Sequence, residues 1–373
     1  MTDVTSGTRS SLLSGSLAVC GALCVAIVAS GTARAHVRYV AEGDGTPTDP
    51  VEFAVQVLSE PANAALFGGT ALVGAAGLLG YVWVRPTIPD LDVLRETLAG
   101  YGDLVPWMLR LSMGLPLVGA GFVGYYFSPA VDGQPSLLLL GLGFLLLFGL
   151  ATRAVAAVAL VAYLAGLARW PELLLAMEYV PGLVAIVLVG GGRPSADHML
   201  GAVASASGTY YGRVDPVHRI AGRFQALIEP YTRYAPTVIR VGLGVVFVYL
   251  GLVEKLLQPG RTLGVVAKYD LTAVIPVDPG AWVLGAGLAE IALGVLLIAG
   301  LLTRGVAAAA FVVFTLTLFG ISDDPILAHI TMFGLASAVF TMGSGPLALD
   351  RVLADTDSEA GRPSLGEREV ADD

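Results

Sequence analysis

The chain is a succession of long apolar stretches separated by short polar connectors. The first stretch covers 10–31, and the second runs from Asn63 to Trp83. Eight more follow in two groups of four, at about 106–127, 136–150, 153–169, 172–190, 236–257, 281–301, 304–320 and 326–343. Roughly 20 apolar residues in a helix cross a bilayer. The pattern therefore predicts an all-α integral membrane protein with ten spans, or nine if the first stretch is removed.

The connectors predict an orientation, because Lys and Arg accumulate on the cytoplasmic side of membrane proteins. With the amino terminus inside, most cations fall in cytoplasmic connectors: Arg85, Arg95, Arg110, Arg153, Arg193, Arg213, Arg219, Arg223, Arg233, Arg240, Arg304 and Arg351. The outer connectors contain Arg34, Arg38, Arg169, Lys255, Arg261 and Lys268. We therefore expect a multi-pass plasma-membrane protein whose carboxyl terminus is cytoplasmic.

The stretches and connectors together predict the domain organisation. Residues 1–35 are a signal peptide or a first anchor, because Ala33-Arg34-Ala35 has the pattern of a cleavage site after an apolar core. The expected order after that is an extracytoplasmic segment at 36–61, a transmembrane helix at 62–85, a four-helix unit at 104–191, a cytoplasmic loop at 192–235, a second four-helix unit at 236–345 and a disordered acidic tail at 346–373. Within the loop, Pro216 to Glu229 has an amphipathic pattern that favours a helix on the inner leaflet or against the bundle.

Composition agrees with a bilayer as the main partner. The chain is 55% hydrophobic and 14% charged, whereas soluble domains are about 45–50% apolar and about 25% charged. The net charge of −9 argues against nucleic acid, which binds basic patches. Cys20 and Cys24 are the only cysteines, and the motifs of soluble nucleotide-binding, redox and zinc enzymes are missing, so no metal site is expected.

The two groups of four stretches are similar to each other in sequence. Residues 110–129 align without gaps on 240–259, and 143–161 align on 294–312. The second block contains Gly-Leu-x-Thr-Arg-x-Val-Ala-Ala in both copies. Since each copy has four spans, both have the same orientation, and a pseudo-twofold axis along the membrane normal is expected.

The second group contains several glycine and charged motifs on three helices: Arg240-x-x-x-Gly244, Gly251-Leu-Val-Glu254-Lys255, Glu290-x-x-x-Gly294 and Gly300-Leu-Leu-Thr303-Arg304. In these motifs it resembles the DoxX family of four-helix membrane proteins. The first group resembles the family weakly, because Gly124-Tyr125 replaces Glu254-Lys255 and Leu139 replaces Glu290. The resemblance implies two tandem DoxX-like bundles after one or two amino-terminal spans, with a degenerate first copy.

Charged groups at membrane depth are costly and usually face a bundle interior or a cavity. The predicted topology brings such groups to the outer half of the second bundle. Glu290 and His329 are the candidate catalytic residues, and Glu254, Lys255 and Asp323 are candidate pocket residues. Each has a structural alternative as well: Lys255 can extend to the surface, Glu254 can be a solvated helix end, Asp323 a helix cap and His329 a partner between helices. In the first unit, we expect Glu178 to pair with Arg169 or Tyr163.

The resemblance implies a membrane subunit of a redox complex linked to a quinone or a small sulfur compound. On that resemblance a quinone or a small sulfur compound would bind near Glu290 and His329, with redox subunits as partners; the cofactor itself stays open, with quinone as one candidate. Two alternatives remain open, a non-catalytic membrane scaffold or assembly factor and a small-molecule transporter. The sequence leaves open whether the protein is an enzyme and whether it forms a homo-oligomer.

Overall fold

The computed structural model describes residues 49–84, 88–132, 136–214, 216–321 and 326–360. The described chain is helical apart from one short hairpin. Six helices are long and apolar enough to cross a membrane: Pro61–Val84, Gly102–Val123, Thr152–Arg169, Ala221–Leu256, Pro279–Ala299 and Thr303–Gly320. Shorter apolar helices cover Leu137–Phe148, Tyr179–Val189 and Ile326–Met342. The expectation of a helical membrane protein is confirmed. The first predicted stretch, 10–31, lies outside the described residues.

Each predicted four-helix unit contains four apolar helices. In the first unit these are α6 (Val105–Val123), α7 (Ser136–Phe148), α8 (Thr152–Arg169) and α9 (Tyr179–Val189). In the second they are α13 (Ala235–Tyr249), α16 (Pro279–Ala299), α17 (Thr303–Gly320) and α18 (Ile326–Met342). The π-helical segment η4 (Leu250–Leu256) continues α13 without a break.

The turn between the second and third helix is the same in both units. Gly149 and Gly300 end α7 and α16 with φ of 67° and 69°, in the left-handed region that glycine adopts without strain. Ala151 and Leu302 then follow, also with positive φ, before α8 and α17 begin. The shared Gly-Leu-x-Thr-Arg sequence therefore encodes a tight reversal between two spans.

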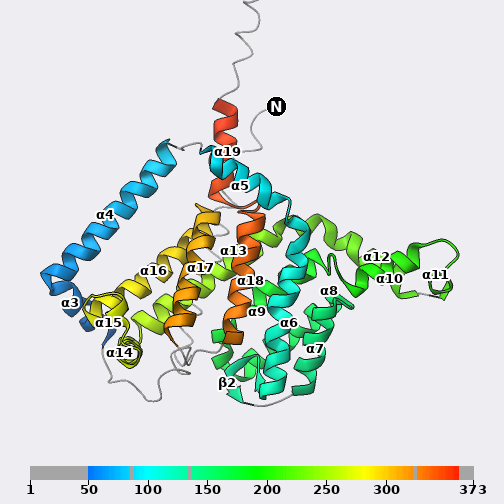
Figure 1. Ribbon diagram of the computed structural model, residues 1–373, viewed down its shortest axis with the longest axis horizontal. Coiled ribbons are helices and arrows are strands. Elements are labelled where there is room, and N and C mark those ends of the chain that lie inside the picture. Colours follow the sequence, from blue (N-terminus) through cyan, green and yellow to red (C-terminus); the bar gives the residue numbers. More distant parts are fainter. Residues whose placement is uncertain (1–48, 85–87, 133–135, 215, 322–325, 361–373) are drawn as a thin grey trace, which may run out of the picture.

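The remaining elements lie at the two ends of the bundle or beside it. One end carries α5 (Pro89–Ala99) and α19 (Leu349–Ala360), and the other carries the hairpin, α14 (Pro259–Lys268) and α15 (Leu271–Val274) (Figure 1). Segments predicted to lie on opposite sides of the membrane thus lie at opposite ends of the molecule. The smaller elements are α3 (Pro50–Ser59), η1 (Gly102–Leu104), η2 (Pro171–Ala176) and η3 (Glu229–Tyr234).

Two predicted stretches are wrong at their outer ends. The stretch at 106–127 is not one helix, because Gly124 ends α6 with φ of 93° and the chain turns into the antiparallel strands β1 (Tyr125–Tyr126) and β2 (Ser128–Asp132). The stretch at 172–190 begins as the 3-10 segment η2 and becomes α-helical only from Tyr179. Glycine and proline at these positions terminate or delay the helix.

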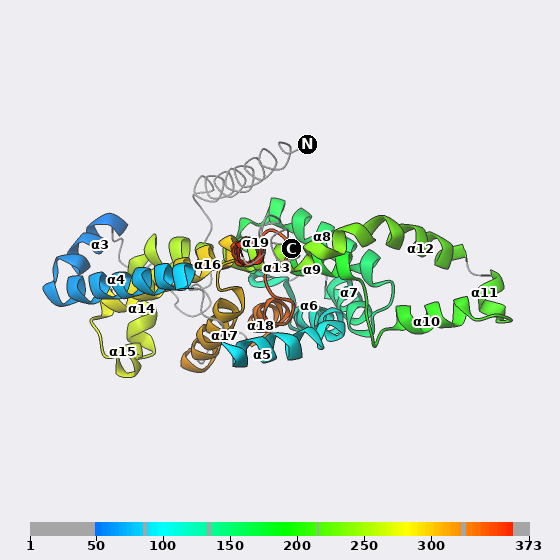
Figure 2. The ribbon, with the colours of Figure 1, turned by 90° about the horizontal axis from the view of Figure 1, so that it is seen from above.

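The two units pack through a reciprocal pair of helix contacts. In Figure 2, α18 of the second unit lies beside α6 of the first, and α13 lies beside α9, and both pairs are in contact. Gly334 faces Ser112 at the first contact, and Gly242 faces Pro181 at the second, each so closely that a Cβ would collide with its neighbour. In the gap-free alignment Ser112 corresponds to Gly242. One apolar core runs through both units.

Two parts of the chain extend away from this core. The helix α4 (Pro61–Val84) contacts α3 at one end, and the most apolar window along it has no buried residues. The helices α10 (Ala196–Ser205), α11 (Tyr210–Val214) and α12 (Pro216–Ile228) form an arm whose main contacts are within itself and with η3. Phe224 and Leu227 are exposed on α12.

Candidate functional site

The π-helical segment η4 carries the two charged residues Glu254 and Lys255, at the end of the α13 span that is predicted to face outside. An α-helix would place them with 3.6 residues per turn, whereas the wider π turn changes which side chains face the neighbouring helix. Glu254 is buried, with 1% of its surface exposed. Lys255 lies next to it and is partly exposed. Such π-helical turns are rare and often occur at functional sites.

A glycine contact brings η4 close to α16. A Cβ added at Gly251 would lie 2.5 Å from the carbonyl oxygen of Gly287 and 3.1 Å from the Cβ of Glu290. About two turns further along both helices, a Cβ at Gly294 would meet the carbonyl oxygen of Gly244 at 2.5 Å. Because both helices lack side chains at these positions, their backbones approach as in small-residue packing of membrane helices. This approach places Lys255 within reach of Glu290.

Lys255 and Glu290 form an ion pair inside the second unit. The Lys255 Nζ donates to both Oε1 and Oε2 of Glu290, each at 2.7 Å. Their side chains are 20% and 11% exposed. Glu290 lies about 16 Å along α16 from its first residue, at the helical rise of 1.5 Å per residue. Each charge offsets the desolvation cost of the other, which neither could bear alone at this depth.

Short helices cover the end of the bundle near this ion pair. The Thr262 hydroxyl of α14 donates to the Glu254 carbonyl oxygen at 3.2 Å, so α14 is fixed to the π-helical segment. Phe53 and Val57 of α3 pack with Val266 of α14 and Ala281 of α16. The ion pair therefore lies beneath a layer of short helices and not at an open helix end.

The other predicted site residues are placed differently. His329 is buried on α18, which packs against α6, α13 and α17. The described hydrogen bonds and ion pairs join Glu290 to Lys255 and not to His329. Asp323 lies outside the described residues. The two cavities with described linings are elsewhere, so an open pocket above Glu290 stays a prediction.

A comparison with known families identifies the part of the chain that carries this ion pair. Residues 235–323 match the family model described as DoxX. This part of the chain is a DoxX domain. No curated protein and no solved structure matches the chain with significance. The match includes Glu254, Lys255 and Glu290, and it ends before α18 and His329. The first unit lies outside the match, so its interpretation as a degenerate copy stays a prediction.

In place of the ion pair of the DoxX domain, the first unit has an aromatic cluster. Where Glu254 and Lys255 extend the helix in the second unit, Gly124 stops it and the hairpin begins. The Phe127 ring lies 5.4 Å from that of Tyr163 and 5.0 Å from that of Tyr179. The Tyr126 hydroxyl donates to the Ala162 carbonyl oxygen at 2.6 Å. The end of this unit that carries the hairpin is therefore filled by aromatic packing.

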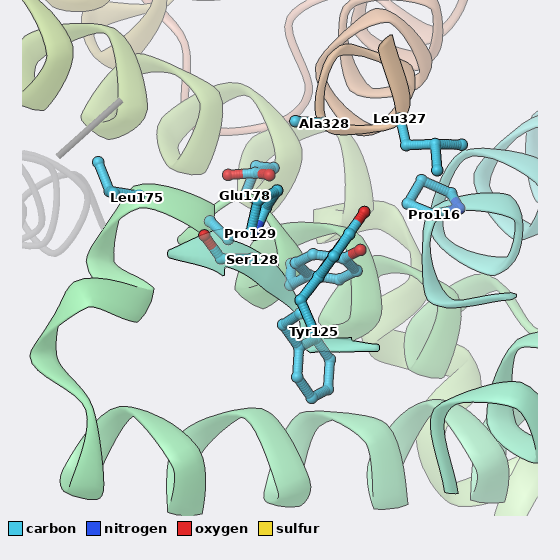
Figure 3. A pocket seen from close by; sticks show the side chains of 11 residues that line it. Pro116, Tyr125, Ser128, Pro129, Leu175, Glu178, Leu327 and Ala328 are labelled. Atoms are coloured by element: carbon cyan, nitrogen blue, oxygen red, sulfur yellow. The ribbon is translucent and has the colours of Figure 1, made fainter. Parts of the chain in front are cut away.

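Glu178 is a second buried carboxyl group, and it lies between the two units. The Thr331 hydroxyl of α18 donates to its Oε1 at 3.1 Å, while Oε2 has no hydrogen-bond partner among the described residues. Glu178 borders a cavity of about 10 Å³, which is about the room one water molecule needs. Figure 3 shows it beside Ser128 and Pro129 of the hairpin and near Ala328 of α18.

The expected partners of Glu178 are wrong. The Tyr163 hydroxyl donates to the Leu173 carbonyl oxygen at 2.7 Å, and the Arg169 guanidinium lies over the Trp170 ring at 5.7 Å. The sequence interpretation considered partners within the first unit only. Thr331 comes from the second unit, so its contact follows from the packing of the two bundles.

A matched polar network at the opposite end of both units was missed by the sequence interpretation. Asp350 accepts hydrogen bonds from the backbone N–H groups of Leu302 and Thr303 at 2.8 and 2.9 Å. Asp197 does the same for Ala151 and Thr152 at 2.6 and 2.8 Å. Each carboxylate therefore caps the third helix of its unit. Extending the alignment of the two units to 190–197 and 343–350 would have matched Asp197 with Asp350. The two sequence blocks that were aligned, which end at 161 and 312, do not include these residues.

Proposed function

We propose that the protein is a membrane subunit of a quinone- or sulfur-linked redox complex. The observation that carries the proposal is the Lys255–Glu290 ion pair, held at membrane depth by a π-helical turn inside the DoxX domain. An ion pair at this depth costs desolvation energy, and a well-packed apolar pair would serve packing equally well. A charged pair in such a place is a functional-site hypothesis with its partner already named.

The ion pair supplies the chemistry that quinone reduction requires of a protein. A quinone takes up two protons with two electrons. In that step the Lys255 ammonium group can donate a proton, and the Glu290 carboxylate can take up a proton from water and pass it on. Glu290 and His329 are the proposed proton carriers, and Lys255 and Glu254 set the charge around them. The electrons come from a redox partner subunit, because the DoxX domain is proposed here as the quinone-binding part.

Kinetics in membranes test this role. We expect Glu290→Gln membranes to show quinone affinity lower by about tenfold, since one charge-assisted contact is worth about that factor. Glu178→Gln is the matched control, because it neutralises a buried carboxyl group outside the DoxX domain. Equal quinone-reduction activity and affinity in wild-type and Glu290→Gln membranes would refute the redox role.

A non-catalytic scaffold is the second candidate, and one observation favours it. The ammonium group of Lys255 contacts both oxygens of Glu290. The two side chains therefore satisfy each other, as in an ion pair that only holds two helices together (a structural clamp). A variant with the two charges exchanged, Lys255→Glu with Glu290→Lys, separates the candidates. A clamp keeps its stability and function after the exchange, whereas a quinone site keeps stability and loses affinity.

We also propose that the first unit is an altered copy of the DoxX domain. We propose in addition that the first helix of each unit begins on the cytoplasmic side of the membrane. Arg110 and Arg240 support the first point, since each donates through Nη2 at 2.6 Å to a carbonyl oxygen in the loop after its unit's fourth helix, Pro194 and Leu347 respectively. The matched aspartate caps support it as well. The concentration of arginines at the end near α5 and α19 supports a cytoplasmic carboxyl terminus in the plasma membrane.

A further inference from the structure

A pocket lined by three arginines opens at the α19 end of the DoxX domain. Its volume is about 570 Å³, and its charged lining residues are Arg233, Arg304 and Arg351. They come from three separate elements: η3, the start of α17 and α19. The rest of the lining is Pro236 and the loop from Met342 to Pro346. Three positively charged side chains from distant parts of the sequence therefore line the same pocket.

The loop that forms the wall of this pocket is held in place by arginines. Arg240 donates to the Ser344 carbonyl oxygen at 3.0 Å and to that of Leu347 at 2.6 Å. Arg304 donates through Nε and Nη2 to the carbonyl oxygens of Phe340 and Thr341 at 3.0 and 3.1 Å. The wall is thus fixed before any ligand arrives, which lowers the entropic cost of binding.

The pocket arginines form no ion pair with a carboxylate among the described residues. Within 4.0 Å, the described ion pairs include no partner for Arg233, Arg304 or Arg351. Among the described residues, the Arg233 guanidinium contacts the neutral Tyr234, through a hydrogen bond of 3.0 Å and a ring contact at 4.9 Å. Asp350 is nearby, but its two oxygens cap α17.

The three arginine charges that line the pocket repel one another. Like charges gathered in one place destabilise each other unless an anion lies between them. An anion with several oxygens would relieve this repulsion and engage the planar donor groups of arginine.

We propose that this pocket binds a phosphate group, supplied by the headgroup of an anionic phospholipid. Arg233 and Arg351 contact the phosphate from the exposed rim, and the half-buried Arg304 forms the base. A lipid is the favoured source because the pocket lies at the ends of two spans, α17 and α18, where headgroups meet a membrane protein. Pro236, Met342 and Pro346 give it an apolar lining beside the charged one.

The first unit provides an internal comparison. It repeats the loop geometry, with positive φ at Gly190 and Gly192 as at Gly343 and Gly345. Arg153 repeats the hydrogen bonds of Arg304, donating to the carbonyl oxygens of Val187 and Leu188 at 3.0 and 3.3 Å. The two rim arginines are not repeated, because the positions aligned with Arg233 and Arg351 hold Asp103 and His198. The rim charges are therefore not needed to form the loop.

Lipid titration of the full-length protein in detergent, read by native mass spectrometry, tests the proposal. The probes are phosphatidylglycerol, phosphatidylcholine and inorganic phosphate. We expect Arg233→Gln/Arg351→Gln to bind phosphatidylglycerol at least about tenfold more weakly than wild type, since two charge-assisted contacts are lost. Binding of zwitterionic phosphatidylcholine should be the same in both proteins.

The control variant is Arg193→Gln/Arg223→Gln, which removes the same net charge from two exposed positions outside the pocket. Equal phosphatidylglycerol binding in wild type and the pocket variant, or an equal loss in the control variant, would overturn the proposal. If inorganic phosphate binds the wild type as tightly as the lipid and is lost only in the pocket variant, the phosphate site stands and the lipid source is overturned. Thermal unfolding of each variant shows that a loss of binding is not a loss of fold.

Discussion

The buried carboxyl groups of the two units differ in how the structure satisfies them. Lys255 and Glu290 neutralise each other through two contacts of 2.7 Å. Glu178 has a hydroxyl donor on one oxygen and a cavity of about 10 Å³ beside it. The first arrangement removes a charge from the bilayer interior by pairing, and the second relies on a neutral hydrogen bond. The two carboxyl groups should therefore respond differently to the loss of their partners.

Neutralising Glu290 should lower stability by leaving an ammonium group without its counter-ion. We expect Glu290→Gln to reduce the free energy of unfolding by about 2 kcal/mol, less than for a fully buried pair because both side chains are partly exposed. The exchanged pair, Lys255→Glu with Glu290→Lys, should recover most of this loss. Denaturant unfolding in detergent, followed by tryptophan fluorescence, compares both variants with wild type. An exchanged variant no more stable than the single one would contradict a direct ion pair.

Removing the hydroxyl group of Thr331 should destabilise the contact between the two units. Thr331→Val leaves Glu178 without its described side-chain donor, and a lost buried hydrogen bond costs about 1–2 kcal/mol. The control is Thr315→Val, because Thr315 is exposed and its hydroxyl bonds to Phe311 of the same helix. Unfolding curves for both variants provide the comparison, and an equal cost at the two positions would rule out a special role for the Glu178 contact.

At the scale of elements, each unit is tied together at one end by a buried arginine and a capping aspartate. Arg240 donates to four carbonyl oxygens, those of Ser344, Leu297, Ile298 and Leu347, at 2.5 to 3.0 Å. Arg110 donates to Pro194, while its Nε and Nη1 have no partner among the described residues. The buried guanidinium group of Arg240 therefore makes more hydrogen bonds than the corresponding group of Arg110 in the first unit.

This difference predicts unequal costs for equivalent substitutions. Arg240→Gln should lower the free energy of unfolding by about 3 kcal/mol, because several charge-assisted hydrogen bonds to helix ends are lost. Arg110→Gln should cost about 1 kcal/mol, since that guanidinium group makes fewer bonds for the same desolvation. Chemical unfolding of the two variants, each compared with wild type, measures both values. A larger cost at Arg110 would show that the first unit is the more dependent on its arginine.

The apolar pattern was sufficient to predict the helices but not their ends. Continuous runs of Leu, Val and Ala located α4, α6 to α9, α13 and α16 to α18, because a bilayer requires such runs. The apolar pattern did not predict that the helix would end at Gly124 and a hairpin follow, because glycine residues also occur inside other spans. The depth of Lys255 and Glu290 indicated that they lie near each other. The π-helical turn carries Lys255 and packs against α16, and the local sequence does not reveal it.

At the scale of the whole molecule, the two units are joined by equivalent contacts between their first and last helices. Ser112 meets Gly334, and Gly242 meets Pro181. Each unit therefore completes its core only with the other, and one apolar cluster includes residues of both. Such reciprocal packing is expected of a parallel repeat around an axis along the membrane normal. The ionic site of one unit and the aromatic cluster of the other are then placed at the same end.

The predicted orientation is tested by labelling single cysteines in cells. In a background without Cys20 and Cys24, Val274→Cys on α15 and Ala354→Cys on α19 introduce exposed thiols at opposite ends of the molecule. An impermeant maleimide should label position 274 in intact cells and position 354 only after permeabilisation, because the arginine-rich end is expected inside. The reverse pattern would invert the topology and place the ion pair near the cytoplasm.

The central claim is that Glu290 and Lys255 hold a small redox molecule in the DoxX domain. Its most direct test is mass spectrometry of small molecules retained by the purified protein, comparing wild type with Glu290→Gln and with Glu178→Gln. The account predicts a quinone or a sulfur compound in the wild type and in Glu178→Gln, and none in Glu290→Gln. The same molecule retained by all three proteins, or none by any of them with Glu290→Gln equally stable, would contradict it and favour the scaffold.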